Sequence, residues 1–404
     1  MKIDIASYLN QFQDYDIRVT KDARYVDQKC TPDIVCFIAD CVLSTSCANK
    51  AFTCNDLWDE NYFISNCRII FHKPSPTNPS AKNEYNKVLC QPLKLLAYAH
   101  ILDVEKVNGV LTFTVRNAEL LEYIATRERN AYNFLLIFFT KVLRDSNLLR
   151  LFEEYEQSIT KAAGNKSAIR LAKTTIYEKY HRFISGNTPS QSKTDVDRIF
   201  HKVFNVISYS KMLPGSTCKI NDWYDLMYNR INWRDLGTNK AKDVTRQESE
   251  DDKEKEINDS IYVQYQISKA CRMVHKMQGD KSEVADNLSM GKATEVHHIF
   301  SKSQYPSLAT TFENLILLTS SQHRQKAHPN SNFALIDQDY QLLCLLSKSK
   351  TIENYLSTID GGFYSKDNFI NVINTGLDKE QINDSSISFD DIRKYLVGYY
   401  NTYI

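Results

Sequence analysis

Glycine and proline are scarce in this chain, which holds 11 and 9 of them among its 404 residues. Both residues interrupt regular structure, and an all-β fold needs many of them in its turns. Their scarcity favours long helices, so we expect an α+β fold that is mostly helical. The hydrophobic share of 42% and the charged share of 25% are typical of a globular protein, and the length predicts two or three domains.

The stretch 294–329 contains four of the nine histidines. His297 and His298 are adjacent and lie within a short run of β-branched and apolar residues. Asn314 opens a second apolar run sixteen residues after His298, and His323 follows nine residues later on a polar segment with a helix-capping start. The expected local order is therefore strand, loop, strand and helix, with imidazoles on the first strand and on the helix.

This order resembles the HNH, or ββα-metal, nuclease motif. Glu295, two residues before the pair, adds the Glu-x-His-His form of the colicin-type DNases, and we include it in the catalytic set. The resemblance implies that His298 is the general base and that His297 and His323 hold one divalent metal. It also implies that Asn314 binds the backbone of the connecting loop and so orients His298. The alternative is that His297 and His298 have only a structural role and that their imidazoles are hydrogen-bonded within the fold.

The chemistry of phosphodiester hydrolysis fits these residue types. The reaction needs a water made nucleophilic at neutral pH and a cation that stabilises the developing charge and the leaving 3′ oxygen. A histidine with an ordinary pKa of about 6.5 is mostly neutral at pH 7 and can accept a proton. Mg²⁺ is the default metal by abundance, whereas imidazole ligands also suit Mn²⁺, Ni²⁺ or Zn²⁺.

The third protein ligand of the metal is left open by the sequence. Some members of the family place a further histidine four residues after the helical one, but that position is Ala327 here, and His328 follows it. Pro329 biases His328 away from α geometry, which would let its ring turn back towards the metal. Either His328 or a water or phosphate oxygen takes the position. Glu283, before the first strand, is a further candidate for the metal shell.

Basic residues are unevenly distributed, although the net charge is only +1. Positions 161 to 202 hold nine lysines and arginines but only three acidic residues. The acidic residues that balance this positive charge lie chiefly at 248–256. This separation permits a phosphate-facing surface, although a solvated helix face has the same pattern. The DNA-binding candidates are Lys106, Arg116, Lys166, Arg170, Lys173, Lys302 and Arg324.

A β-hairpin is predicted over 104–115. Asn108 and Gly109 lie between two β-branched runs there, which is the strongest short hairpin signal. Helices followed by a hairpin are the order of a winged-helix module, which places one helix in the major groove of DNA, though many other small domains share that order. Lys82, Lys87 and Lys94 would then face DNA along with Lys106 and Arg116, and Lys73 belongs to the same set.

These patterns predict four segments. Residues 1–116 form a winged-helix-like DNA-recognition module, and residues 117–240 form a helical, basic DNA-binding region. Residues 241–258 are polar and poor in apolar side chains, so we expect a linker there. Residues 259–404 form the HNH nuclease domain.

No apolar run is long enough to cross a bilayer, and the first residues lack an apolar secretory core. We therefore expect a cytoplasmic protein without membrane association. None of the ten cysteines makes a Cys-x-x-Cys pair, so the motif at 294–329 lacks the cysteine brace of many HNH nucleases and depends on packing.

A long helical region before a nuclease motif is similar to the layout of HNH-class type II restriction endonucleases. The amino-acid sequence at 293–303 is also similar to theirs. This resemblance implies a sequence-specific double-strand DNA endonuclease that leaves 5′-phosphate and 3′-hydroxyl ends. It also implies a cognate DNA methyltransferase as a system partner, without direct binding, and a homodimer on DNA.

Two other functions stay open on the sequence alone. The chain could be a methylation-dependent, phage-defence or nicking HNH nuclease, because the same catalytic residues serve each. It could also be a DNA-binding protein with an inactive HNH fold.

Overall fold

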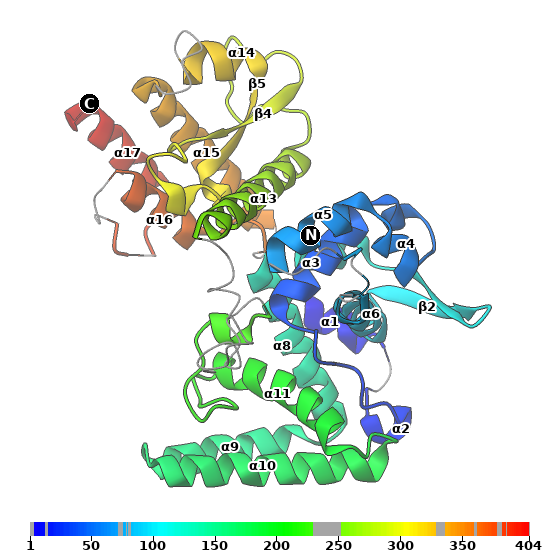
Figure 1. The fold of residues 1–404 in the computed structure, drawn as a ribbon. Coiled ribbons are helices and arrows are strands. Elements are labelled where there is room, and N and C mark those ends of the chain that lie inside the picture. The colour runs from blue at the N-terminus through cyan, green and yellow to red at the C-terminus, as the bar shows by residue number, and fades with distance from the viewer. Residues whose placement is uncertain are drawn as a thin grey trace. The chain divides into compact units, whose positions relative to one another are not determined.

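The computed structural model describes residues 4–12, 15–71, 76–77, 79, 82–228, 252–328, 336–358, 362–377, 382–384 and 386–403, with the backbone alone at 68–69, 252–262 and 403. The chain is α+β and mostly helical, as the scarcity of glycine and proline predicts (Figure 1). It divides into an N-terminal unit, Asp4–Lys255, and a C-terminal unit, Glu256–Ile404. Lys73 lies outside the described residues.

The first half of the N-terminal unit combines helices with a small sheet. The strands pair antiparallel in the order β1-β3-β2. Its elements are α1 (Ile5–Asn10), α2 (Ile17–Thr20), α3 (Pro32–Leu43), η1 (Ser46–Asn49), β1 (Phe52–Thr53), α4 (Cys54–Trp58), α5 (Asn61–Phe71), α6 (Lys82–Tyr98), β2 (Leu102–Val107) and β3 (Val110–Val115).

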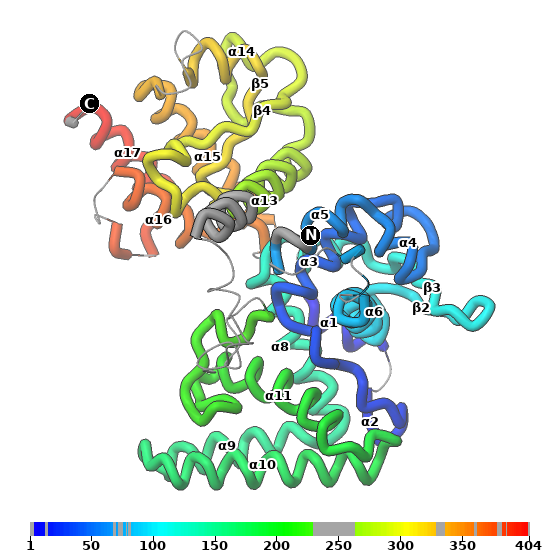
Figure 2. Tube along the Cα trace, viewed as in Figure 1, coloured from blue at the N-terminus to red at the C-terminus, as the bar shows by residue number. Residues whose placement is uncertain are grey.

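The hairpin predicted over 104–115 is present. Asn108 and Gly109 have φ angles of 49° and 84°, the left-handed conformation that a two-residue turn between twisted strands requires. Val107 pairs with Val110 across this turn. The two-residue strand β1 adds to the other side of β3, and the hairpin extends away from the helices of its unit (Figure 2).

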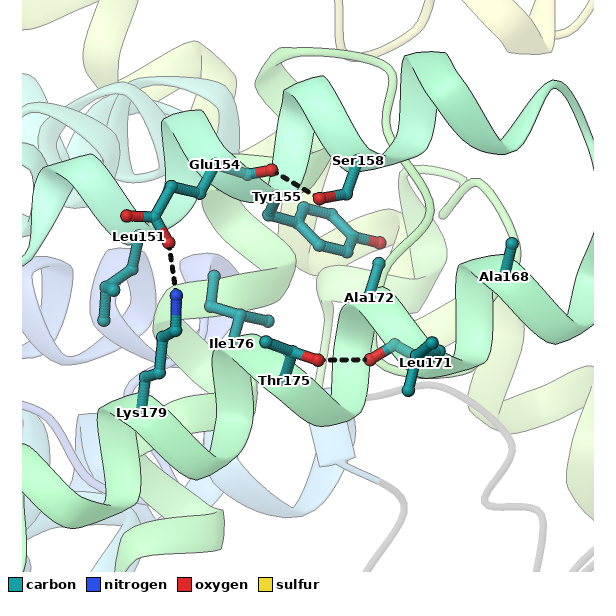
Figure 3. A pocket seen from close by; sticks show the side chains of 10 residues that line it. All are labelled: Leu151, Glu154, Tyr155, Ser158, Ala168, Leu171, Ala172, Thr175, Ile176 and Lys179. Atoms are coloured by element: carbon teal, nitrogen blue, oxygen red, sulfur yellow. Dashed lines mark hydrogen bonds and ion pairs between the residues drawn. The ribbon is translucent and has the colours of Figure 1, made fainter.

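The second half of the N-terminal unit is helical. It comprises α7 (Ala118–Thr126), α8 (Glu128–Asp145), α9 (Leu149–Ala162), α10 (Lys166–Asn187), α11 (Lys193–Ser210) and η2 (Tyr224–Leu226). Helices α9 and α10 form a hairpin that turns at Ala163 and Gly164, both at positive φ. Figure 3 shows a pocket between them, where Lys179 pairs with Glu154 at 2.5 Å. Part of the basic charge on α10 is therefore neutralised within the unit.

The C-terminal unit surrounds a two-stranded antiparallel sheet with helices. Helix α13 spans Asp252–Gln278, so residues 252–258 of the predicted linker are helical, and the division between the two units falls within the predicted range. Residues 241–251 lie outside the described residues. The other elements are β4 (Ala293–His298), η3 (Pro306–Leu308), η4 (Phe312–Asn314), β5 (Leu315–Thr319), α14 (Ser320–Gln322), the π-helix η5 (His323–Ala327), α15 (Gln338–Thr358), α16 (Lys366–Gly376) and α17 (Phe389–Tyr403).

The core of the C-terminal unit holds β4 and β5 in place. Every residue of β5 is buried, which is why its sequence is a continuous apolar run rather than an alternating one. Phe300 packs against Gly376 of α16, where an added Cβ would lie 2.4 Å from the phenyl ring. Phe312 stacks on Phe363 with ring centroids 4.5 Å apart. This packing supports the segment around the two strands in a chain that has no Cys-x-x-Cys pair.

Candidate metal centre

Three imidazoles converge in the C-terminal unit. His297 lies on β4, His323 begins the π-helix η5, and His328 follows its end. One ring nitrogen from each lies within 4.8 Å of the other two. The ring centroids are 4.9 to 5.3 Å apart, and the rings meet edge to face. This cluster could hold a metal ion.

A π turn brings His328 into this cluster. Its backbone N–H donates to the carbonyl of His323, five residues earlier, at 3.1 Å. The turn is one residue wider than an α-helical turn, so the side chain at the fifth position returns to the face where an α-helix would place the fourth. His328 has φ −124° and ψ 91°, the extended backbone favoured before Pro329. The structure therefore places His328, not Ala327, beside His297 and His323.

Burial disfavours the charged form of two of these imidazoles, those of His297 and His323. It holds the pKa of His297 well below the ordinary value, and the neighbouring His323, His328 and His298 lower that pKa further. Burial also lowers the pKa of His323, and the carboxylate of Glu295 opposes this shift. A neutral imidazole offers a nitrogen lone pair, which is the form that binds a metal.

Asn314 is fully buried and binds the loop between the two strands. Its Nδ2 donates to the carbonyls of Phe300 at 3.0 Å and Leu308 at 3.2 Å, and its Oδ1 accepts from the Phe300 N–H at 2.8 Å. The backbone carbonyl of Asn314 also accepts from the N–H of Ile299 at 2.9 Å. These are the loop contacts that the motif predicts for this residue, and they hold the chain immediately after His298.

His298 is positioned by one hydrogen bond to the same loop. Its Nε2 lies 2.9 Å from the carbonyl oxygen of Ala309. Because a carbonyl only accepts, Nε2 carries the proton and Nδ1 is the basic nitrogen. Burial lowers the pKa of His298, the bond to Ala309 opposes that shift, and Lys302 adds to it. The ring is thus a neutral base in a fixed orientation.

The two acidic candidates have different positions. Glu295 accepts a hydrogen bond from the hydroxyl of Ser320 at 3.0 Å and lies close enough to influence the pKa of His323. The side chain of Glu283 is buried and pairs with Lys348 at 3.0 Å. Its Oε1 also accepts from the backbone N–H of Leu317 in β5 at 2.9 Å. The prediction that Glu283 belongs to the metal shell is therefore wrong, because its carboxylate is used to anchor β5.

Gln322, directly before His323, is a site residue that sequence reasoning missed. It closes a capping box with Thr319, whose hydroxyl accepts from the Gln322 N–H at 3.2 Å. Its buried side chain also donates to the Val284 carbonyl at 2.8 Å and to the carboxylate of Asp286 at 2.9 Å. The Thr-x-x-Gln spacing was a visible signal for this cap.

The basic candidates fall in both units. Lys302 and Arg324 are exposed in the C-terminal unit, each next to the site in sequence. In the N-terminal unit, Lys106 lies on the hairpin, and Lys166 and Arg170 are exposed on α10. Two others have intramolecular partners: Lys173 donates to the carbonyl of Ser216 at 2.9 Å, and Arg116 pairs with Asp103 at 3.1 Å.

No family model, curated protein or solved structure matches the chain. Within the described ranges, the helices are all too short or too polar to cross a membrane. The geometry around His297 is therefore the basis for a functional proposal.

Proposed function

We propose that the chain is a metal-dependent endonuclease that hydrolyses phosphodiester bonds in double-stranded DNA. The observation that carries the proposal is the convergence of His297, His323 and His328, with His298 next to His297 in the sequence and Nδ1 as the basic nitrogen of His298. A strand, a loop bound by the buried Asn314, a second strand and a short helix carry these residues, and this order supports the proposal because it resembles that of an HNH, or ββα-metal, nuclease domain.

The residues divide the reaction between them. Nδ1 of His298 takes a proton from a water molecule whose oxygen attacks phosphorus. The bond between phosphorus and the 3′ oxygen breaks, that oxygen takes a proton from a solvent water to become the 3′-hydroxyl, and the phosphate stays on the 5′ end. His297, His323 and His328 would hold a cation, which would supply positive charge for the phosphate and for the leaving oxygen. Lys302 and Arg324, which are exposed, would contact neighbouring phosphates.

The donor set bears on which metal binds. Three imidazole nitrogens favour Zn²⁺, Ni²⁺ or Mn²⁺ over Mg²⁺, which prefers oxygen ligands. Abundance favours Mg²⁺, which would then bind through phosphate and water oxygens as well. Each of the four metals therefore belongs in the assay.

The wider proposal is a type II restriction endonuclease of the cytoplasm. The N-terminal unit recognises DNA, with 1–116 as a winged-helix module and the basic face of α10 as a second contact. A methyltransferase with the same specificity protects the host. One site cuts one strand, so two copies act together on a duplex. Cleavage that stays first order in enzyme while cutting both strands would rule out this pairing.

Plasmid cleavage by the wild-type protein and by His298→Ala tests the proposal. Discrete fragments that vanish in the variant support a site-specific nuclease, and a smear that vanishes supports a nuclease without specificity. Cleavage of methylated plasmid alone would indicate a methylation-dependent enzyme, and nicking alone a nickase. Equal cleavage by both proteins would show that His298 is not the base. Absence of both cleavage and metal binding by calorimetry would indicate a DNA-binding protein with an inactive HNH fold.

A further inference from the structure

Helix α6 has a polar outer face that the proposed chemistry does not use. Its inner face is buried through Tyr85, Val88, Leu89, Pro92, Leu93, Leu95 and Leu96. The opposite side carries what we call the reading face, defined by Asn83, Asn86, Lys87, Cys90 and Lys94. At 100° per residue these five positions fall on one side of the helix.

We infer that the reading face of α6 enters the major groove of duplex DNA and contacts base edges there. This inference rests on the proposed function and extends it, because it assigns the part of the chain that selects the cleavage site. Three observations support it: the topology around α6, the groove beside the helix, and the chemistry of the exposed side chains.

The topology holds α6 rigidly next to a hairpin. Helices α3 and α4 both pack on α6, and β2 follows it directly and packs on it. Strand β1, between α3 and α4, pairs with β3, which ties the hairpin to the helices. A helix that is packed on one side, open on the other and flanked by a hairpin can enter a groove while the hairpin lies along the backbone.

A groove of about 560 Å³ lies between α6 and the hairpin. Val104, Leu111 and Phe113 form its apolar wall, and Lys106 lies beyond them towards the hairpin tip. Asn86, Lys87, Cys90 and Lys94 of the reading face also line this groove, together with Arg24, Asp22 and Asp27. The two aspartates would repel phosphate, so we expect base edges, and not the DNA backbone, to approach the reading face on this side.

The exposed side chains on α6 are those that read bases. Asn83, Asn86 and Lys94 are exposed, and Lys87 is half-buried. An asparagine amide can bind the edge of adenine, and a lysine ammonium can bind the acceptors of guanine. The thiol of Cys90 donates to Oδ1 of Asn86 at 3.0 Å, which holds this amide on the outer face.

A neighbouring side chain shows the contrast. Gln91 lies at the edge of the same face, but its Oε1 accepts from the backbone N–H of Lys29 at 2.8 Å. This hydrogen bond supports the fold of the N-terminal unit, so we exclude Gln91 from the residues that contact base edges. Asn86 and Lys87 are therefore the residues on which specificity depends most.

Duplex DNA fits this surface better than RNA does. The major groove of B-form DNA is about 12 Å wide and admits an α-helix. The major groove of A-form RNA is too deep and narrow for side chains to read. A preference for RNA is an outcome that the test below can detect.

Selection from a random duplex library by the full chain in EDTA tests the inference, since metal removal prevents cleavage. The wild-type protein should enrich a short sequence. Asn86→Ala and Lys87→Gln should each relax the preference at one or two positions and weaken binding of the enriched duplex by about 5- to 100-fold, while binding of unrelated duplex changes little. Lys219→Ala, an exposed lysine away from α6, is the matched control.

The outcomes separate this inference from the nuclease proposal. The inference that the reading face contacts base edges would be overturned by any of three results, even if plasmid is cleaved. These are the absence of an enriched sequence, an unchanged sequence preference in both variants, and tighter binding of RNA than of duplex DNA. Enrichment that the variants relax would support it even if no metal gives cleavage, and the nuclease proposal alone would then fail. Circular dichroism melting of each variant excludes unfolding, and Lys87→Arg should restore binding of the enriched duplex if a cationic donor is what this position supplies.

Discussion

The side-chain amide of Asn314 closes a ring with the backbone of Phe300, donating to its carbonyl and accepting from its N–H. A third bond, to the carbonyl of Leu308, ties the far side of the loop to the same amide. Ala309, the acceptor for His298, directly follows Leu308. One buried side chain thus fixes both the end of β4 and the residue that orients the proposed base.

Replacing Asn314 with alanine should free this loop. Three buried hydrogen bonds are lost, and at about 1 kcal/mol each the local cost is about 3 kcal/mol. Hydrogen exchange of the Phe300 amide should accelerate accordingly, and cleavage should fall because His298 loses its support. Asn371→Ala, at an exposed position of the same unit, is the control. Unchanged exchange at Phe300 would contradict this role.

The three converging histidines should each contribute to metal affinity. Isothermal titration with Zn²⁺ is expected to show binding to the wild type that His297→Ala, His323→Ala or His328→Ala weakens by more than the ~10- to 100-fold cost of losing an outer-shell partner. His298→Ala should bind metal normally while losing cleavage. Retention of full affinity by His328→Ala would assign the third position to water or phosphate instead.

The π turn makes an unusual prediction about length. Deleting Lys326, which is exposed, should convert the turn to an α-helical one and place the second imidazole four residues after His323. Metal binding should survive, because both spacings bring the two rings to one face. If deletion of Lys326 alone removes metal binding, the wider turn is essential, and the proposal that the two spacings are equivalent is wrong.

Metal binding should resist moderate acidification. A histidine must lose its proton to bind a metal, and the pKa values of His297 and His323 lie below their ordinary value because of burial. A lowered pKa keeps each ring deprotonated until the pH falls below about 6.5, the ordinary histidine value. Calorimetry should give equal affinities at pH 7.5 and 6.5 and a loss only at lower pH. A marked loss already between those two values would contradict the burial argument.

The buried pair of Lys348 and Glu283 should support the site through packing. Lys348→Met leaves the carboxylate of Glu283 buried without a counter-charge, at a cost of about 3–5 kcal/mol in unfolding free energy. Adding Glu283→Gln should recover most of it. Lys394 and Asp391 form an exposed pair in the same unit, so Lys394→Met should leave urea unfolding close to wild type. If Lys348→Met and Lys394→Met lowered the unfolding free energy equally, the stabilising role of the buried Lys348–Glu283 pair would be refuted.

Short-range signals in the sequence were the reliable ones. The turn at Asn108 and Gly109 predicted the hairpin, and the spacing of His298, Asn314 and His323 predicted which residues surround the loop, although their catalytic roles stay predictions. Strand β1 was not predicted, because two residues carry no periodic pattern.

Features that depend on distant contacts could not be predicted. Glu283 looked like a metal ligand because it precedes β4, but Lys348, 65 residues later, takes its carboxylate. The place of His328 was also open, since a π turn has no sequence signature that separates it from an α turn.

The π turn between His323 and His328 also bears on how a metal motif can change over time. When one residue is inserted into a helix and the hydrogen bonds on either side are kept, such a turn forms. The side chains that flank the insertion then stay on one face of the helix. If the deletion of Lys326 leaves metal binding intact, the four-residue step is one of two lengths that the same site tolerates. A pattern written with a five-residue step would find chains that the narrower pattern passes over.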